Sequence, residues 1–165
     1  MNYTLGVDIG TSGTKAVAFG DHGEVIAGHR IGYPLLNPQP GYVEQDPDTL
    51  FDAVIGTIAQ TVREVRERNS GSHLLGVGFS SAMHGLMAVD ADGRPLTPCI
   101  TWADTRSEAF ATRLRYTPEG RALYTRTGTP IHPMSPLVKL GWWRDHEPDL
   151  LESAYKLISI KEYVF

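Results

Sequence analysis

A carboxylate, several small hydroxylated residues and a lysine follow one another within eight residues near the start of the chain. They are Asp8, Gly10, Thr11, Ser12, Gly13, Thr14 and Lys15. An apolar run precedes Asp8, so we expect this carboxylate at the end of a strand, with a tight turn after it. Glycines in such a turn let backbone amides approach phosphate oxygens. The hydroxyls add donors, and Asp8 can hold a hydrated Mg²⁺ through water. The pattern predicts a phosphate and magnesium site, and the alternative is a glycine-rich β-turn of no chemical importance.

Two other phosphate-binding patterns are absent from the sequence. The motif Gly-x-x-x-x-Gly-Lys-Ser/Thr does not occur, and neither does Gly-x-Gly-x-x-Gly. A Walker A loop and a Rossmann dinucleotide site are therefore not supported.

Two later segments carry side chains suited to binding a polyol. Met83 and His84 follow an apolar run that predicts a strand, and ligands of open α/β sheets gather at strand ends. Trp102 can place a flat apolar wall against the C–H face of a sugar, while Asp104 and Arg106 supply oriented polar groups. The alternatives are a solvated turn for His84, a helix N-cap for Asp104 and a surface position for Arg106.

The elements around these residues predict an α/β domain. Short apolar runs at 3–9, 15–19 and 24–31 are separated by glycine-containing turns, which indicates an antiparallel three-stranded meander. Asp46 followed by proline marks a helix start, and apolar residues at helical spacing continue to about 68. The run at 74–79 predicts a fourth strand of the same sheet, apolar enough to be buried on both faces.

The rest of the chain predicts further elements at 86–89 and 99–102 (a hairpin), 104–115, 118–126 and 135–146 (helices) and 154–160 (a strand). Ser135 is expected to cap the third of these helices, and Trp142 and Trp143 are expected in the core. Three antiparallel strands, a helix and a strand form the opening of a ribonuclease-H-like domain. Because the last residues are apolar, we expect the domain to continue beyond residue 165.

The bulk composition narrows the classes of partner. The 165 residues include 15 basic and 19 acidic ones, a net charge of -4, which argues against nucleic acid and anionic membranes as partners. The single Cys99 excludes an intrachain disulfide and a cysteine-rich zinc site. We see no secretion signal and no apolar stretch long enough to cross a bilayer, so a cytoplasmic location is expected. A homo-oligomer is left open.

Taken together, these segments resemble the FGGY family of carbohydrate kinases over residues 5–165. The pattern beginning at Asp8 resembles the family's first phosphate loop. Met83 and His84 resemble the sugar-binding turn of its xylulokinase and gluconokinase branches, where glycerol kinases carry Arg-Glu, and residues 102–106 resemble its second substrate segment. The stretch 126–137 resembles the gluconokinase branch most specifically, as do residues 100–104 and 160–165.

The resemblance implies two ribonuclease-H-like domains of the actin and Hsp70 type, with ATP and sugar meeting between them. Residues 1–165 would be a partial N-terminal domain. The C-terminal nucleotide domain and the general-base Asp would lie beyond it, so we expect the fragment alone to be inactive. The implied cofactors are ATP and Mg²⁺. The implied ligand contacts are Asp8, Gly10, Thr11, Ser12, Thr14 and Lys15 for phosphates and magnesium, and Met83, His84, Trp102, Asp104 and Arg106 for the sugar.

The expected activity of the parent protein is ATP-dependent phosphorylation of D-gluconate to 6-phosphogluconate. A xylulokinase, or another pentulose or polyol kinase, is the nearest alternative. A non-catalytic actin-like nucleotide-binding module is the alternative from another class. Arg106 is the expected partner of the gluconate carboxylate, because a guanidinium binds a carboxylate through two parallel hydrogen bonds. His84 is the other candidate for that bond, and a purely bracing role for Arg106 is also open.

Overall fold

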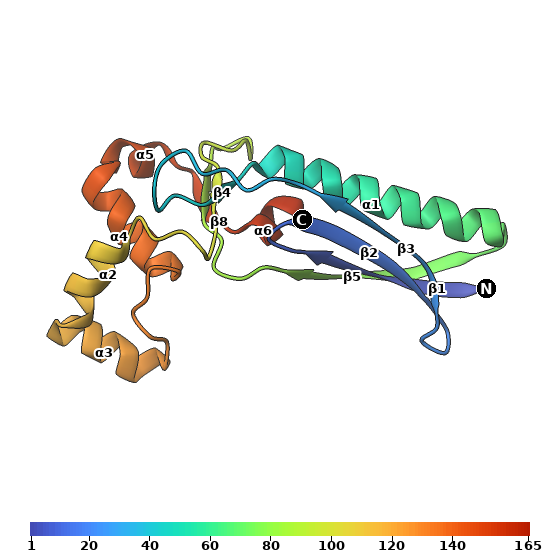
Figure 1. The fold of residues 1–165 in the computed structure, drawn as a ribbon, viewed down its shortest axis with the longest axis horizontal. Helices are drawn as coiled ribbons and strands as arrows, with labels where there is room; N and C mark the ends of the chain where they lie inside the picture. The colour runs from blue at the N-terminus through green and yellow to red at the C-terminus, as the bar shows by residue number, and fades with distance from the viewer. The chain divides into compact units, whose positions relative to one another are not determined.

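A four-stranded sheet and one long helix make up most of the first of the two units into which the chain divides (Figure 1). The computed structural model describes all 165 residues. The first unit comprises Met1–Leu35, Asp46–Ala82 and Lys161–Phe165, and the second comprises Leu36–Gln45 and Met83–Ile160.

The sheet of the first unit has the strand order β3-β2-β1-β5. Its members are β1 (Asn2–Ile9), β2 (Gly13–Gly20), β3 (Val25–Gly32) and β5 (His73–Ser81). The first three strands pair antiparallel in chain order, and β5 adds to β1 in parallel. The predicted meander is confirmed, and so is the prediction that residues 74–79 join the same sheet.

Helix α1 (Pro47–Arg68) has the predicted bounds. The side chain of Asp46 accepts a hydrogen bond from the backbone N–H of Thr49 at 2.7 Å, and proline occupies the first helical turn, which satisfies an otherwise unpaired donor at the helix start. One face of α1 packs on β2 and β3. The core there contains Tyr3, Leu5, Ala18, Ala27 and Val65.

Replacing Asp46 by Ala should lower the free energy of unfolding by about 1 kcal/mol, because the Thr49 N–H loses its acceptor. Urea denaturation measures the change. Asp52→Ala, at an exposed site within the same helix, is the control and should stay within about 0.5 kcal/mol of the wild type. Equal effects of the two substitutions would show that the capping bond contributes nothing.

Strand β5 is less buried than its sequence predicts. Leu74 is 42% exposed, Leu75 63% and Val77 40%. The strand lies at the edge of the sheet, and α1 packs on β2 and β3 at the other side. The prediction that both faces of this strand are buried is therefore wrong, because a run of apolar residues indicates a strand without saying which neighbours cover it.

The second unit contains two small sheets and a group of helices. Strand β4 (Glu44–Gln45) pairs with β7 (Cys99–Ile100), and β6 (Met87–Val89) pairs with β8 (Lys156–Ile158). The helices are α2 (Glu108–Arg115), α3 (Pro118–Thr127), α4 (Pro136–His146) and α5 (Pro148–Ser153). A short α6 (Ile160–Val164) follows β8, and all of it but Ile160 belongs to the first unit. No helix of the chain combines the length and apolar character needed to span a membrane.

Trp142 and Trp143 are buried on α4, as predicted, and pack with Leu86, Ala88 and Ile100. Several details of this unit differ from expectation. The segments 86–89 and 99–102, expected to form a hairpin, pair with β8 and β4 instead and meet each other at the isolated Leu86–Ile100 bridge. Helix α2 begins at Glu108 rather than at 104, and α5 was not predicted. Ser135 stands at the N-cap position of α4, but its side chain makes no capping hydrogen bond.

Candidate functional site

Asp8 and Lys15 lie side by side on the face of the first unit's sheet that α1 does not cover. They are directly opposite one another on β1 and β2, and both are exposed. Ser80 on β5 is the register partner of Asp8 on its other side. These three side chains line a hollow of about 510 Å³, together with Gly6, Val7, Val17, Phe19, Gly78 and Phe79. Ser80 was not expected from the sequence, because strand register alone places it beside Asp8.

The turn between β1 and β2 is held by hydrogen bonds from β3 and the residue after it. The Gly10 N–H donates to the carbonyl of Gly13 at 3.1 Å. The Tyr33 hydroxyl donates to the Gly10 carbonyl at 2.7 Å, and Arg30 Nη2 donates to the Ser12 carbonyl at 3.2 Å. A Cβ on residue 13 would lie 2.8 Å from the carbonyl oxygen of Ile31, so only glycine fits there. Arg30 also places a cation beside this turn, which the sequence analysis missed.

Thr14 does not present its hydroxyl to this surface. Side chains alternate along β2, so Thr14 points to the face opposite Lys15 and is fully buried. Its Oγ1 lies 3.2 Å from the Tyr33 hydroxyl. Burial raises the pKa of Tyr33, so this hydroxyl stays protonated and donates to the Gly10 carbonyl while it accepts from Thr14. Thr14 thus supports the turn from the buried face of the sheet, and a contact of its hydroxyl with a phosphate stays a prediction.

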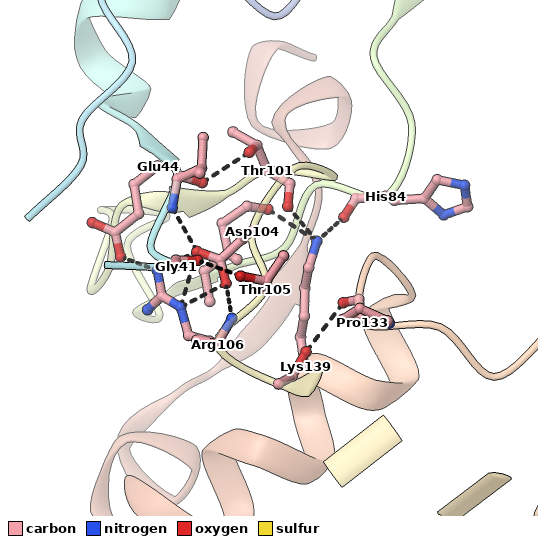
Figure 2. A network of polar contacts seen from close by, with 12 residues as sticks. Gly41, Glu44, His84, Thr101, Asp104, Thr105, Arg106, Pro133 and Lys139 are labelled. Atoms are coloured by element: carbon pink, nitrogen blue, oxygen red, sulfur yellow. Dashed lines mark hydrogen bonds and ion pairs between the residues drawn. The ribbon is translucent and has the colours of Figure 1, made fainter. Parts of the chain in front are cut away.

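In the second unit, Arg106 is surrounded by two carboxylates of its own chain (Figure 2). Its Nε donates to Asp104 Oδ1 at 2.9 Å, and its Nη2 donates to Asp104 Oδ2 at 2.7 Å and to Glu44 Oε1 at 2.5 Å. The guanidinium carbon lies 3.6 Å from the centre of the Tyr42 ring, and only 5% of the side chain is exposed. We call Glu44, Asp104 and Arg106 the Arg106 cluster. Burial alone would lower the pKa of Arg106, but its hydrogen bonds to the two carboxylates outweigh burial and raise it.

Asp104 anchors the segment 101–106 to the segment that contains β4. Its Oδ2 accepts the Val43 N–H at 2.7 Å and its Oδ1 accepts the Arg106 N–H at 3.0 Å. The Thr101 N–H and hydroxyl both donate to the Val43 carbonyl. Asp104 is therefore not a helix N-cap as the sequence suggested, since α2 starts later, after Ser107. Because its side chain is fully buried, Asp104 holds the segment in place, and a direct contact with a sugar stays a prediction.

Met83 and Trp102 are exposed on this unit, and His84 is partly buried. Met83 is 73% exposed and Trp102 50%. His84 adopts a φ of 67°, a left-handed conformation that is rare outside glycine. Figure 2 shows its imidazole pointing away from the Arg106 cluster. These three are therefore less enclosed than Asp104 and Arg106 among the sugar-site candidates.

A lysine that the sequence analysis did not single out connects the two substrate segments. Lys139 on α4 is fully buried, and its ammonium group donates to the backbone carbonyls of His84 and Thr101 at 2.5 and 2.8 Å (Figure 2). Burial lowers the pKa of Lys139 to about 8. The structure thus gathers the phosphate candidates in the first unit and the sugar candidates in the second.

Comparisons with known proteins identify the family of the chain. The model for the N-terminal domain of the FGGY family of carbohydrate kinases matches residues 3–165. A gluconokinase of Bacillus subtilis is 46% identical over 99% of the chain, and a xylulose kinase of Staphylococcus xylosus is 30% identical over 99%. The crystal structure of a gluconate kinase from Lactobacillus acidophilus superposes with a TM-score of 0.89 at 32% identity, covering 99% of this chain.

The chain spans 31% of the length of the Bacillus subtilis relative, 33% of the Staphylococcus xylosus relative and 32% of the Lactobacillus acidophilus chain. Its fold is that of the sugar kinases, with the mixed sheet of the actin and Hsp70 type of ATPase. The chain therefore belongs to the FGGY family of carbohydrate kinases.

Proposed function

We propose that this chain is the sugar-binding and first phosphate-loop part of an ATP-dependent kinase that converts D-gluconate to 6-phosphogluconate. The observation that carries the proposal is the 46% identity to the Bacillus subtilis gluconokinase, against 30% to the xylulose kinase over the same length of chain. A cytoplasmic location is part of the same proposal, since the reaction consumes ATP.

On the phosphate side, the proposal uses the exposed pair of Asp8 and Lys15. Both line the hollow beside the β1–β2 turn, where Lys15 and Arg30 supply positive charge for phosphate oxygens. The carboxylate of Asp8 is the kind of oxygen donor that suits a hydrated Mg²⁺. When bound, the ion would neutralise charge on the phosphates. The turn would contact the phosphates through Gly10, Thr11 and Ser12. Because the turn already has a fixed shape, binding would not have to pay the entropy of ordering it.

On the sugar side, the proposal assigns contact to Met83, His84 and Trp102. Trp102 would stack on the C–H face of gluconate, and His84 would exchange hydrogen bonds with its hydroxyls or carboxylate. Asp104 and Arg106 would not contact the sugar but would hold the segment that carries Trp102 in position. Two roles were considered for Arg106, binding of the gluconate carboxylate and bracing of its own segment, and the proposal adopts the second. A guanidinium already paired with two carboxylates and 5% exposed has little to offer a third.

Phosphoryl transfer depends mainly on alignment and on neutralising charge, to which the proposed phosphate and sugar contacts would contribute. The proton of the attacking hydroxyl needs an acceptor, which we propose to be an Asp outside residues 1–165. We also place the adenosine-binding domain outside this chain, since the chain spans 31% of its Bacillus subtilis relative. A pentulose kinase is the second candidate, favoured by the 30% identity to the xylulose kinase.

Substrate profiling of the full-length protein that contains this chain tests the proposal. We expect kcat/KM for D-gluconate to exceed that for D-xylulose by about tenfold or more, a difference of about 1.4 kcal/mol in transition-state binding. Preference for D-xylulose would favour the second candidate, and ATP binding without phosphorylation of any sugar would favour a non-catalytic nucleotide module. Residues 1–165 alone should show no turnover, and a rate of about 1–100 s⁻¹ from them, typical of kinases, would contradict the assignment of the base to another part of the protein.

A further inference from the structure

Lys139 occupies a position where an apolar residue would be expected. It lies on α4 beside Val138, Trp142 and Trp143, all of them buried, and none of its surface is exposed. Burying an ammonium group costs several kcal/mol unless good partners replace its water. A leucine or methionine would fill the same space without that cost. The groups that accept hydrogen bonds from Lys139 therefore indicate the role of its buried charge.

All three partners are backbone carbonyls, and they come from the two segments that carry the sugar-site candidates. The ammonium nitrogen lies 2.5 Å from the oxygen of His84, 2.8 Å from that of Thr101 and 3.4 Å from that of Ile100. His84 is itself a candidate contact for the sugar, and Thr101 immediately precedes Trp102, another candidate. Three donors on one rigidly buried group match three acceptors.

The bridge stands where regular pairing between the two segments stops. Leu86 and Ile100 exchange both backbone hydrogen bonds, at 3.0 and 2.8 Å. Two residues before Leu86, the chain turns at His84, whose φ of 67° departs from strand geometry. Lys139 connects the His84 carbonyl to the Thr101 carbonyl at that point (Figure 2). Two carbonyls cannot bond to each other, so a donor from a third element is needed to hold them at a fixed distance.

We propose that Lys139 is a positioning residue for the sugar site, whose ammonium group holds the His84 turn against the start of the 101–106 segment so that Met83, His84 and Trp102 meet one substrate. This inference rests on the proposed function. It gives α4 and Lys139 a part in sugar binding although Lys139 would touch no ligand. Because every carbonyl in the bridge belongs to the second unit, loss of the bridge should affect the binding of sugar and not that of ATP.

The test compares Lys139→Met with Val138→Ala in the full-length protein, using D-gluconate, D-xylulose, ATP and Mg²⁺. Methionine is unbranched like lysine, fills most of the same space and removes the donors. Val138 is equally buried on the same helix but packs with Ala111 and Ile131, so its truncation loosens the same unit without touching the bridge. We expect Lys139→Met to lower kcat/KM for the sugar by about 10- to 100-fold, the effect of an ångström-scale misplacement, with the KM for ATP unchanged.

The outcomes separate the two claims. A Lys139→Met enzyme whose sugar KM and kcat/KM match those of Val138→Ala would overturn the positioning role, while turnover by the wild type keeps the proposed function. A wild type that phosphorylates neither sugar would remove the proposed function, and the role of Lys139 with it.

A measurement on the wild type covers the case in which Lys139→Met does not fold. The pKa of about 8 means that the ammonium loses its charge and one donor within the working range. The groups that influence it are Cys99 on β7, whose pKa is raised by burial to about 11, and the Asp104 and Arg106 side chains. We expect the sugar KM to rise severalfold between about pH 7 and about pH 9.5, with no matching change for ATP. The titration of Lys139 is followed in parallel by NMR of its Nζ, and a sugar KM that stays constant while this group loses its proton would overturn the proposal.

Discussion

Replacing Arg106 by Gln is expected to destabilise the full-length protein by about 3–5 kcal/mol, because it leaves buried carboxylates without their cation. The side chain of Asp104 is fully buried and that of Glu44 is 11% exposed. Both accept hydrogen bonds from the guanidinium, and glutamine can replace neither its charge nor its two-sided geometry. Urea denaturation, followed by a probe of the second unit such as Trp142 and Trp143 fluorescence, measures the loss.

Arg113→Gln is the matched control for this prediction. Arg113 pairs with Asp145 at 2.9 Å, but 62% of its side chain is exposed, so its removal should cost between about 0 and 1 kcal/mol. Kinetics then separate bracing from direct substrate binding. If Arg106 braces the 101–106 segment, D-gluconate and neutral D-xylulose should lose similar factors in kcat/KM. An additional loss of about 1.5–3 kcal/mol for gluconate alone, the worth of a charged hydrogen bond, would restore Arg106 as the carboxylate partner.

Asp8→Asn should reduce kcat of the full-length protein by about 10²–10³-fold, the usual effect of removing one electrostatic contact from a transition state. Asparagine keeps the shape of the side chain but removes the charge that we propose to organise Mg²⁺ beside the transferring phosphate. Because Asp8 is exposed at the edge of the hollow, the thermal midpoint should change little. The measurement is kcat at saturating ATP, sugar and Mg²⁺.

Asp21→Asn provides the comparison for the Asp8 substitution. Asp21 is an exposed carboxylate in the turn between β2 and β3 of the same unit, so its neutralisation changes the net charge equally and should leave kcat unaltered. A near-normal kcat for Asp8→Asn at saturating Mg²⁺ would reduce Asp8 to a residue at the end of a strand with no part in the chemistry.

The elements that the sequence predicted well are those with complete local signals. Helix α1 combines a capping aspartate, a proline in its first turn and an apolar stripe at helical spacing, and its predicted bounds of 47–68 match the structure. The meander was predictable for a similar reason, since short apolar runs joined by glycine turns leave few other ways to pair. In both cases the determining residues are neighbours along the chain.

The errors concern residues whose environment is set by distant parts of the chain. Asp104 has the residue type and position of an N-cap, but Val43 and Arg106 occupy its oxygens. Thr14 lies in a hydroxyl-rich turn, yet the start of β2 directs it to the buried face. The exposure of β5 depends on which strands α1 covers. The partners of Asp104 and the exposure of β5 cannot be read from local patterns, whereas the burial of Thr14 follows from side-chain alternation once the start of β2 is known.

Lys139 left a signal in the sequence that was not used. Positions 139, 142 and 143 have the spacing of one helical face, and two of them are tryptophans expected in the core. A lysine on such a face must find buried acceptors, so it merited attention as a connecting residue. Which carbonyls it meets could not be inferred, because both segments lie about 40 or more residues earlier in the chain.

The scaffold behind the sugar site contains two carboxylates, Glu44 and Asp104, and two cations, Arg106 and Lys139, all largely withdrawn from solvent. A protein interior tolerates such a set only while its charges balance. Loss of any one member would leave an uncompensated charge, so these four positions are not free to drift independently during evolution. We expect viable homologues to exchange them in concert, by replacing an acid together with a base, and attempts to redesign substrate choice through residues 83–84 or 101–106 would have to respect the same balance.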